Sequence, residues 1–182
     1  MKRFAALSLL IVGLVASLAW AEVKSGLQVG DSCGAFNVKD ITGPNKGTSL
    51  CYRCKYGTRP VITIFTREVN DELAKLVKEV DGVVGKNSDQ KMAAFVVVLA
   101  EDADKVAPKL EALAKKEGIK NVPLTIFDGE AGPEDYKIAK DASVTVMMWT
   151  KSEVKVNHAL EKGGLNDSTI KEIIADSSKI LK

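Results

Sequence analysis

The chain has 182 residues, of which 46% are hydrophobic and 5% aromatic, and its formal net charge is +2 at pH 7. This length and composition suit one globular domain with its own core, and they exclude a collagen-like, repeat or disordered chain. The small net charge gives no electrostatic case for binding nucleic acid or an anionic membrane.

The first 21 residues form a predicted signal peptide. Lys2 and Arg3 precede an uncharged apolar run, and Ala19 and Ala21 occupy the small-residue positions that a signal peptidase reads. We expect cleavage after Ala21 and export to the periplasm or the medium, with no membrane contact afterwards; the alternative is an uncleaved membrane anchor. Cleavage lowers the Lys+Arg count from 26 to 24, which equals the 24 acidic residues, so the mature domain is formally neutral.

The mature chain begins with a predicted β-hairpin. An alternating segment, 36–39, is followed by the turn residues Gly43-Pro44-Asn45 and by a return strand that ends near Leu50. Five further strands are expected at 60–65, 93–100, 122–128, 143–150 and 153–160, because these runs are apolar and rich in β-branched residues. The last two are joined by a turn at 150–152.

Helices are expected between these strands. One follows the cap residue Asn70, a second follows Asp104 and stops at Gly118, a short one starts at Pro133, and a last one follows Asp167. Strands that alternate with helices predict an α/β fold with a mixed, mostly parallel central sheet and helices on both of its faces. We expect a single domain over 22–182, with the hairpin at its N-terminus.

The segment VGDSCGAFNVKDITG, 29–43, resembles the opening of the peroxiredoxin (AhpC/TSA) and TlpA-like branch of the thioredoxin superfamily, V-G-D-x-A-P-x-F-x-L-x-D-x-x-G. The matching residues are Val29, Gly30, Asp31, Phe36, Asp40 and Gly43. The order of strands and helices downstream is also that of this branch. The resemblance therefore implies a thioredoxin-like sandwich.

Two features that the resemblance implies are absent from the sequence. Members of this branch carry a reactive cysteine just after the first core strand, where a helix begins and lowers the thiol pKa. The residues there are 66–73, TREVNDEL, without a cysteine, and the stretch 141–149 lacks the cis-proline that usually precedes a later strand. No catalytic residue is therefore transferred from the resemblance.

The cysteines lie elsewhere. Cys51 and Cys54 form a C-x-x-C pair before the first core strand, and Cys33 precedes the hairpin. Antiparallel pairing brings Cys33 to the same end of the hairpin as the pair, so we expect a three-cysteine cluster. Any two of the three can bond where their Cα atoms lie within about 7 Å, which leaves three pairings open.

The candidate functional residues are these three cysteines. The nearby cations Arg53, Lys55 and Arg59 favour thiolate. Cys51 and Cys54 are therefore redox candidates, with Cys33 as a resolving or third thiol and a protein thiol or disulfide as the partner. A second hypothesis is a non-catalytic interaction or scaffold module in which a structural disulfide ties the hairpin to the core.

A third hypothesis is a metal carrier, in which His158, the single histidine of the chain, completes a Cys3His set. A c-type haem anchor needs C-x-x-C-H, but Lys55 stands in the histidine position. We therefore expect no cofactor.

Overall fold

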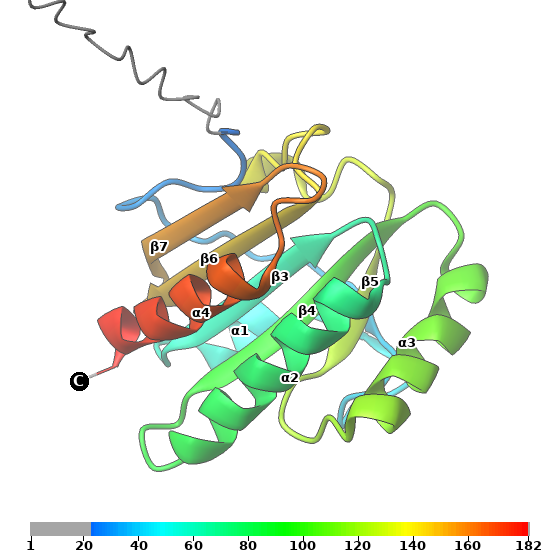
Figure 1. Ribbon diagram of the computed structural model, residues 1–182, viewed down its shortest axis with the longest axis horizontal. Coiled ribbons are helices and arrows are strands. Elements are labelled where there is room, and N and C mark those ends of the chain that lie inside the picture. The colour runs from blue at the N-terminus through cyan, green and yellow to red at the C-terminus, as the bar shows by residue number, and fades with distance from the viewer. Residues whose placement is uncertain (1–22, 182) are drawn as a thin grey trace, which may run out of the picture.

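The computed structural model describes residues 23–181, and its centre is a seven-stranded sheet (Figure 1). The sheet order is β2-β1-β5-β4-β3-β6-β7. The strands are β1 Val38–Asp40, β2 Ser49–Leu50, β3 Val61–Thr66, β4 Ala93–Ala100, β5 Leu124–Asp128, β6 Val144–Thr150 and β7 Glu153–Leu160. The α-helices are α1 Tyr52–Tyr56, α2 Asp71–Lys86, α3 Ala103–Glu117 and α4 Asp167–Asp176, and the 3-10 turns cover Glu134–Tyr136 and Ser177–Ile180. The expected signal peptide lies outside the described residues.

The sheet is mixed, as expected, but its parallel part is smaller than the sequence suggested. Only β3 with β4 and β4 with β5 pair in parallel. The pairs β1–β2, β1–β5, β3–β6 and β6–β7 are antiparallel. A helical crossover returns the chain for a parallel strand, whereas a tight turn reverses it, so the N-terminal hairpin and the turn at 150–152 make both edges antiparallel.

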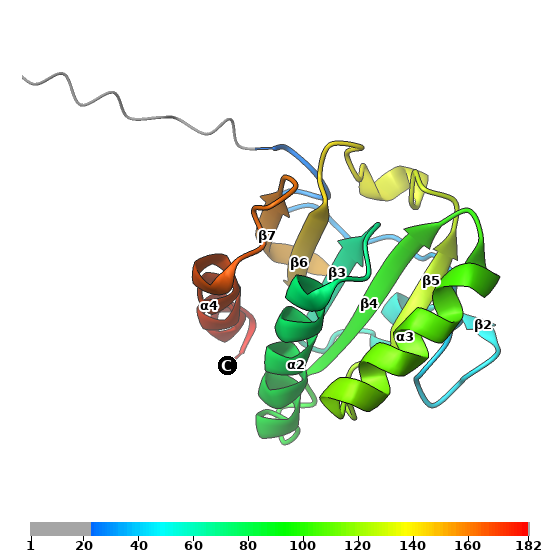
Figure 2. The same cartoon turned by 45° about the vertical axis from the view of Figure 1, so that its right-hand side comes forward.

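Three helices cover one face of the sheet. Figure 2 shows α2, α3 and α4 side by side on this face. The strands β3, β4 and β5 follow one another across the sheet in one direction, so right-handed crossovers place α2 and α3 on the same side. The buried residues of this layer include Ile62, Ile64, Leu73, Leu76, Val80, Leu110 and Ile173.

The opposite face, called the back face below, is covered mainly by irregular chain. It carries α1, the segment before β1, and the connection 129–143 that crosses from β5 to β6. Its buried core includes Tyr52, Phe65, Phe95, Tyr136, Met147 and Trp149. The helix expected from Pro133 is wrong: only one 3-10 turn forms, because Pro133 has extended ψ and Lys137 adopts a left-handed conformation directly after the turn.

Helix starts follow the expected chemistry. The side chain of Asn70 accepts the Leu73 N–H at 2.9 Å and caps α2, as expected. Helix α3 begins two residues earlier than the sequence suggested, because Asp102 rather than Asp104 caps it. Gly118 ends α3 in the left-handed conformation, and no helix within 23–181 is long and apolar enough to cross a membrane.

Candidate functional site

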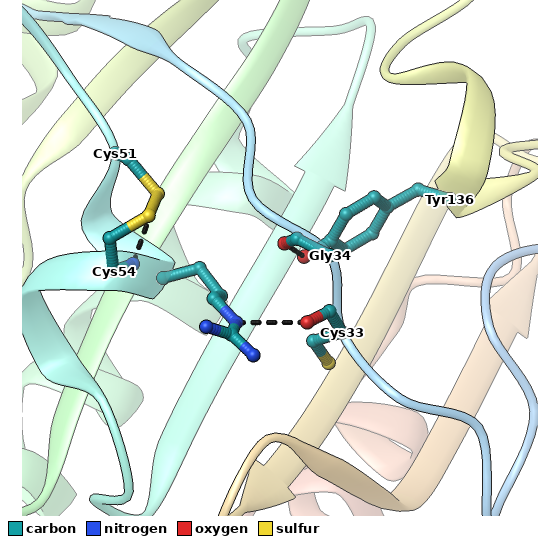
Figure 3. Close-up of a disulfide and its surroundings, with 6 residues drawn as sticks. Cys33, Gly34, Cys51, Cys54 and Tyr136 are labelled. Atoms are coloured by element: carbon teal, nitrogen blue, oxygen red, sulfur yellow. Dashed lines mark hydrogen bonds between the residues drawn. A yellow bond between two sulfur atoms is a disulfide. The ribbon is translucent and has the colours of Figure 1, made fainter.

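The C-x-x-C pair forms a disulfide within a helical turn that the sequence did not predict. Cys51 and Cys54 are bonded, with their sulfurs 2.05 Å and their Cα atoms 5.2 Å apart (Figure 3). Cys51 is the N-cap of α1, and its Sγ accepts the backbone N–H of Cys54 at 3.0 Å. Cys54 is exposed and Cys51 is half-buried. The pair therefore presents an accessible disulfide whose better-covered sulfur already has a hydrogen-bond donor.

The disulfide closes a single turn and joins no two elements. Its two residues are three positions apart, and both belong to the start of α1. The Cys51–Cys54 bond therefore does not tie the hairpin to the core, and this part of the second hypothesis is wrong. Something else must hold α1 in place.

A buried tyrosine inside the C-x-x-C loop anchors α1. Tyr52 is 1% exposed, and its ring stacks on Phe95 of β4 with the centroids 5.4 Å apart. Its hydroxyl donates to Oδ2 of Asp40 at 2.7 Å. Burial, followed by this hydrogen bond, raises the pKa of Tyr52. The side chain between the two cysteines thus fixes the disulfide helix to the sheet.

Asp40 is the centre of a compact turn. Besides Tyr52, its carboxylate accepts the backbone N–H groups of Gly43 at 2.7 Å and Asn45 at 2.8 Å. A Cβ on Gly43 would lie 2.6 Å from the Tyr52 hydroxyl and 2.7 Å from the Asp40 carboxylate, so only glycine fits there. Two residues of the D-x-x-G pattern therefore position the disulfide helix.

Cys33 lies near the pair, but its thiol does not face it. Nε of Arg53, from the middle of the C-x-x-C loop, donates to the Cys33 carbonyl at 2.8 Å. The sulfur of Cys33 points away from the disulfide in Figure 3. Cys33 is a free cysteine that is 2% exposed, and burial raises its pKa to about 12 although Arg53 opposes this shift. The structure brings the backbone of Cys33 to α1 and leaves its thiol protonated.

The Cys3His hypothesis is wrong. Cys51 and Cys54 are bonded to each other, and Nε2 of His158 lies 3.1 Å from Oδ2 of Asp176 at the end of α4. Among residues 23–181, no three His, Cys, Asp or Glu side chains are grouped to hold a metal ion. The histidine instead joins β7 to α4.

Two basic side chains of α1 and the loop after it lie against tyrosine rings. The Lys55 ammonium lies 5.6 Å from the centre of the Tyr52 ring, and the Arg59 guanidinium carbon lies 6.0 Å from that of Tyr56. Tyr56 in turn reaches over β4, where its hydroxyl donates to the Ala94 carbonyl at 3.4 Å. The cations are therefore held beside α1 by the two tyrosines.

The carboxyl end of β3, where the resemblance implies a reactive cysteine, is built differently. Arg67 donates from Nε to the Glu130 carbonyl and from Nη1 to the carbonyls of Ala139 and Ala142, at 2.9 to 3.1 Å. These bonds fasten the β5–β6 connection. A cavity of about 550 Å³ lies at this end, lined in part by Glu68, Asn70 and Ser143. No cysteine is among its lining residues in the part of the chain that the structure describes.

Sequence reasoning missed α1 and its anchor. The pattern that could have found them is the combination of Asp40, Gly43 and Tyr52, an Asp-x-x-Gly turn followed by a tyrosine between two cysteines. A cysteine is also an unusual N-cap, because serine, threonine, aspartate and asparagine are the preferred residues there. Neither pattern is enough by itself to predict which group the Tyr52 hydroxyl or the Cys51 sulfur binds.

Comparisons with known proteins identify the fold. No family model and no curated protein matches the sequence. Among solved structures, a candidate protein disulfide isomerase from Bacteroides thetaiotaomicron aligns at TM-score 0.65 and 14% identity, covering 87% of this chain and 94% of that one. A candidate thiol:disulfide interchange protein DsbE from Chlorobium tepidum aligns at 0.60 and 12%, covering 83% and 99%.

Peroxidoxin BcpB from Mycobacterium tuberculosis aligns at TM-score 0.59 and 14% identity, covering 86% of this chain and 99% of that one. At these identities the likeness concerns the fold and not the chemistry. It agrees with the opening segment 29–43 and with the strand order of the sheet. The chain therefore has a thioredoxin-like fold, with its C-x-x-C disulfide before the first core strand rather than after it.

Proposed function

We propose that this protein exchanges disulfides with protein thiols through Cys51 and Cys54. The observation that carries the proposal is an accessible C-x-x-C disulfide at the start of a short helix, with no structural connection for the bond to maintain. An exposed disulfide with basic neighbours suits exchange, because nearby cations stabilise the thiolate that leaves. The thioredoxin-like fold is consistent with this role.

The exposure of the two sulfurs suggests an order of events. A partner thiolate attacks Sγ of the exposed Cys54, the Cys51–Cys54 bond breaks, and Cys51 leaves as the thiolate. The product is a mixed disulfide between the partner and Cys54. The Cys54 N–H, which already points at Cys51 Sγ at 3.0 Å, stabilises the departing charge. A second thiol of the partner then attacks the mixed disulfide, so the partner is oxidised and the pair is left as two thiols.

Cys33 takes no part in this step in the described conformation. Its thiol is buried, and its raised pKa keeps it protonated at neutral pH. A resolving role for Cys33, which the sequence suggested, requires that the segment before β1 first leave the back face. The proposal therefore assigns exchange to two of the three candidate cysteines.

We also propose that the exchange takes place after export. The basic start, apolar run and Ala19–Ala21 site of the sequence support cleavage of a signal peptide. A periplasmic or extracellular setting keeps a disulfide oxidised and supplies protein thiols to react with it. N-terminal sequencing of the protein from the exporting cell tests this point, and a start at Glu22 is expected.

Redox titration against glutathione, with mixed-disulfide trapping, tests the exchange. We expect a reduction potential above about −300 mV, the region of labile rather than structural disulfides. Cys51→Ser should accumulate a mixed disulfide at Cys54, Cys54→Ser should trap less, and Cys33→Ser should exchange like the wild type. A potential below that limit, with no trapped species, would sink the proposal in favour of a non-catalytic interaction module.

A further inference from the structure

The chain segment that contains the disulfide is rich in basic residues. The ten residues from Cys51 to Pro60 contain Arg53, Lys55 and Arg59 and no acidic residue. Lys55 and Arg59 are exposed. In the part of the chain that the structure describes, neither takes part in an ion pair, whereas most of the ion-paired lysines lie on or beside the helices of the opposite face.

A third cation reaches this surface from a distant part of the chain. The carbonyl of Thr58 accepts the backbone N–H of Lys151 at 3.2 Å and the Thr150 hydroxyl at 3.5 Å. This places the β6–β7 turn beside the loop that follows α1. Lys151 is exposed and likewise makes no ion pair within 23–181, since Glu153, the nearest acid along the chain, pairs with Lys155.

We infer that Lys55, Arg59 and Lys151, the basic rim, select thiol partners whose cysteine is flanked by acidic residues. This inference rests on the proposed exchange at Cys51 and Cys54. Fixed cations beside a reactive bond raise the local concentration of a negatively charged partner and orient it on approach. Lys55 follows the exposed Cys54 in the sequence and is itself exposed. A carboxylate one or two residues from the attacking thiol of the partner is therefore expected to lie near the Lys55 ammonium.

Because the mature domain is formally neutral, any attraction of an acidic partner must come from the basic rim itself. The predicted mature chain has 24 basic and 24 acidic residues, so attraction of an acidic partner cannot come from overall charge. Since charges separated by more than about 8 Å are largely screened at physiological ionic strength, only cations close to the disulfide act on a bound partner. The selectivity should therefore depend on these three side chains and on salt.

Rates of exchange with three synthetic cysteine peptides test the inference on the full mature protein. The peptides carry two aspartates, two serines or two lysines around the cysteine. Each rate is divided by the rate of the same peptide with hydroxyethyl disulfide, which removes differences in intrinsic thiol reactivity. We expect the acidic peptide to react about tenfold faster than the serine peptide at 20 mM salt, and this advantage to shrink at 500 mM.

A variant with Lys55→Gln, Arg59→Gln and Lys151→Gln should lose the preference for the acidic peptide. The preference is the ratio of the corrected acidic-peptide rate to the corrected serine-peptide rate, so any general loss of thiolate stabilisation cancels. The matched control replaces Lys109, Lys115 and Lys171, which are exposed on α3 and α4, by glutamine and should keep the preference. Exchange with all three peptides at equal corrected rates overturns the inference and leaves the proposed function standing. Failure of every peptide to form a mixed disulfide overturns the proposed function instead.

Discussion

The two ends of β3 differ from what the resemblance implies: the cysteine pair lies before the strand, and the residues after it make structural hydrogen bonds. Before the amino end of the strand lies an accessible disulfide held by a buried tyrosine and a buried carboxylate. At the carboxyl end lie Arg67, which fastens the β5–β6 connection, and Asn70, which caps α2. A disulfide thus lies before β3, and structural hydrogen bonds occupy the position where the resemblance implies a reactive cysteine.

The C-x-x-C disulfide of this thioredoxin-like sheet therefore lies at the opposite end of β3 from the position that the resemblance implies. A helix lies next to each end of β3, α1 before it and α2 after it, and the N-terminus of each helix offers backbone N–H groups to a capping side chain. What decides is which side chains each end presents. The following predictions are arranged from the largest expected effect to the smallest, and each one tests this division between the two ends.

The buried thiol should be far less reactive than the reduced pair. With its pKa near 12, Cys33 holds on the order of a thousandfold less thiolate at pH 8 than an ordinary cysteine. In reduced native protein, iodoacetamide should therefore label Cys54 at least a hundredfold faster than Cys33, as read by peptide mass spectrometry. Equal labelling in the folded state would add a second reactive thiol and break the comparison.

The same thiol should make the stability depend on pH. Its pKa is raised in the folded state, so the unfolded chain loses this proton first, and the stabilisation is complete below about pH 8.5 and is lost as the pH rises towards 12. Urea unfolding between pH 8.5 and 9.5, where the tyrosines of the unfolded chain are still mostly protonated, should show a decline that is clearly smaller in Cys33→Ala. A decline of equal slope in both proteins would refute this explanation.

The carboxylate that anchors α1 should be the main stabilising group at the amino end. Asp40→Ala leaves the Tyr52 hydroxyl and the N–H groups of Gly43 and Asn45 without their acceptor, which should lower the free energy of unfolding by about 3 kcal/mol. Urea denaturation measures this. Lys39→Ala, one residue away with an exposed side chain, is the control and should change little. A loss below 0.5 kcal/mol for Asp40→Ala, on the order of a routine surface substitution, would contradict the anchor.

The carboxyl end should affect stability only. Asn70→Ala removes the cap of α2 and should cost about 1 kcal/mol, with no change in the rate of disulfide exchange. Asn166→Ala, which removes the cap of α4, is the matched variant and should behave alike. Slower exchange in the Asn70 variant alone would show that this end also takes part in the chemistry.

The sequence predicted the hairpin, the seven strands and three of the four α-helices because each has a local signal: β-branched runs for the strands, and cap residues such as Asn70 for the helices. The prediction was wrong where tertiary packing determines the local structure. The turn after Pro133 stays short because it crosses the back face over packed aromatic rings, including Phe36 and Tyr136, which are 4.7 Å apart. Local propensity contains no information on this packing.

The cysteines show the same limit. Their place before β3 followed from the sequence, and so did the nearness of Cys33 to the hairpin end. The direction of the Cys33 thiol could not be predicted, because it depends on a tertiary contact in which Arg53 donates a hydrogen bond to the Cys33 carbonyl. The disulfide pairing could not be predicted from the sequence spacing either, because three pairings were possible. The helical turn that starts at Cys51 brings the sulfurs of Cys51 and Cys54 together.

Arg67 has a consequence for attempts to graft a family-type active site onto this scaffold. Its guanidinium holds three carbonyls of the β5–β6 connection, at Glu130, Ala139 and Ala142. Any redesign that turns this corner into a thiol site must therefore supply new donors for those carbonyls, or the connection above the sheet will lose its fastening.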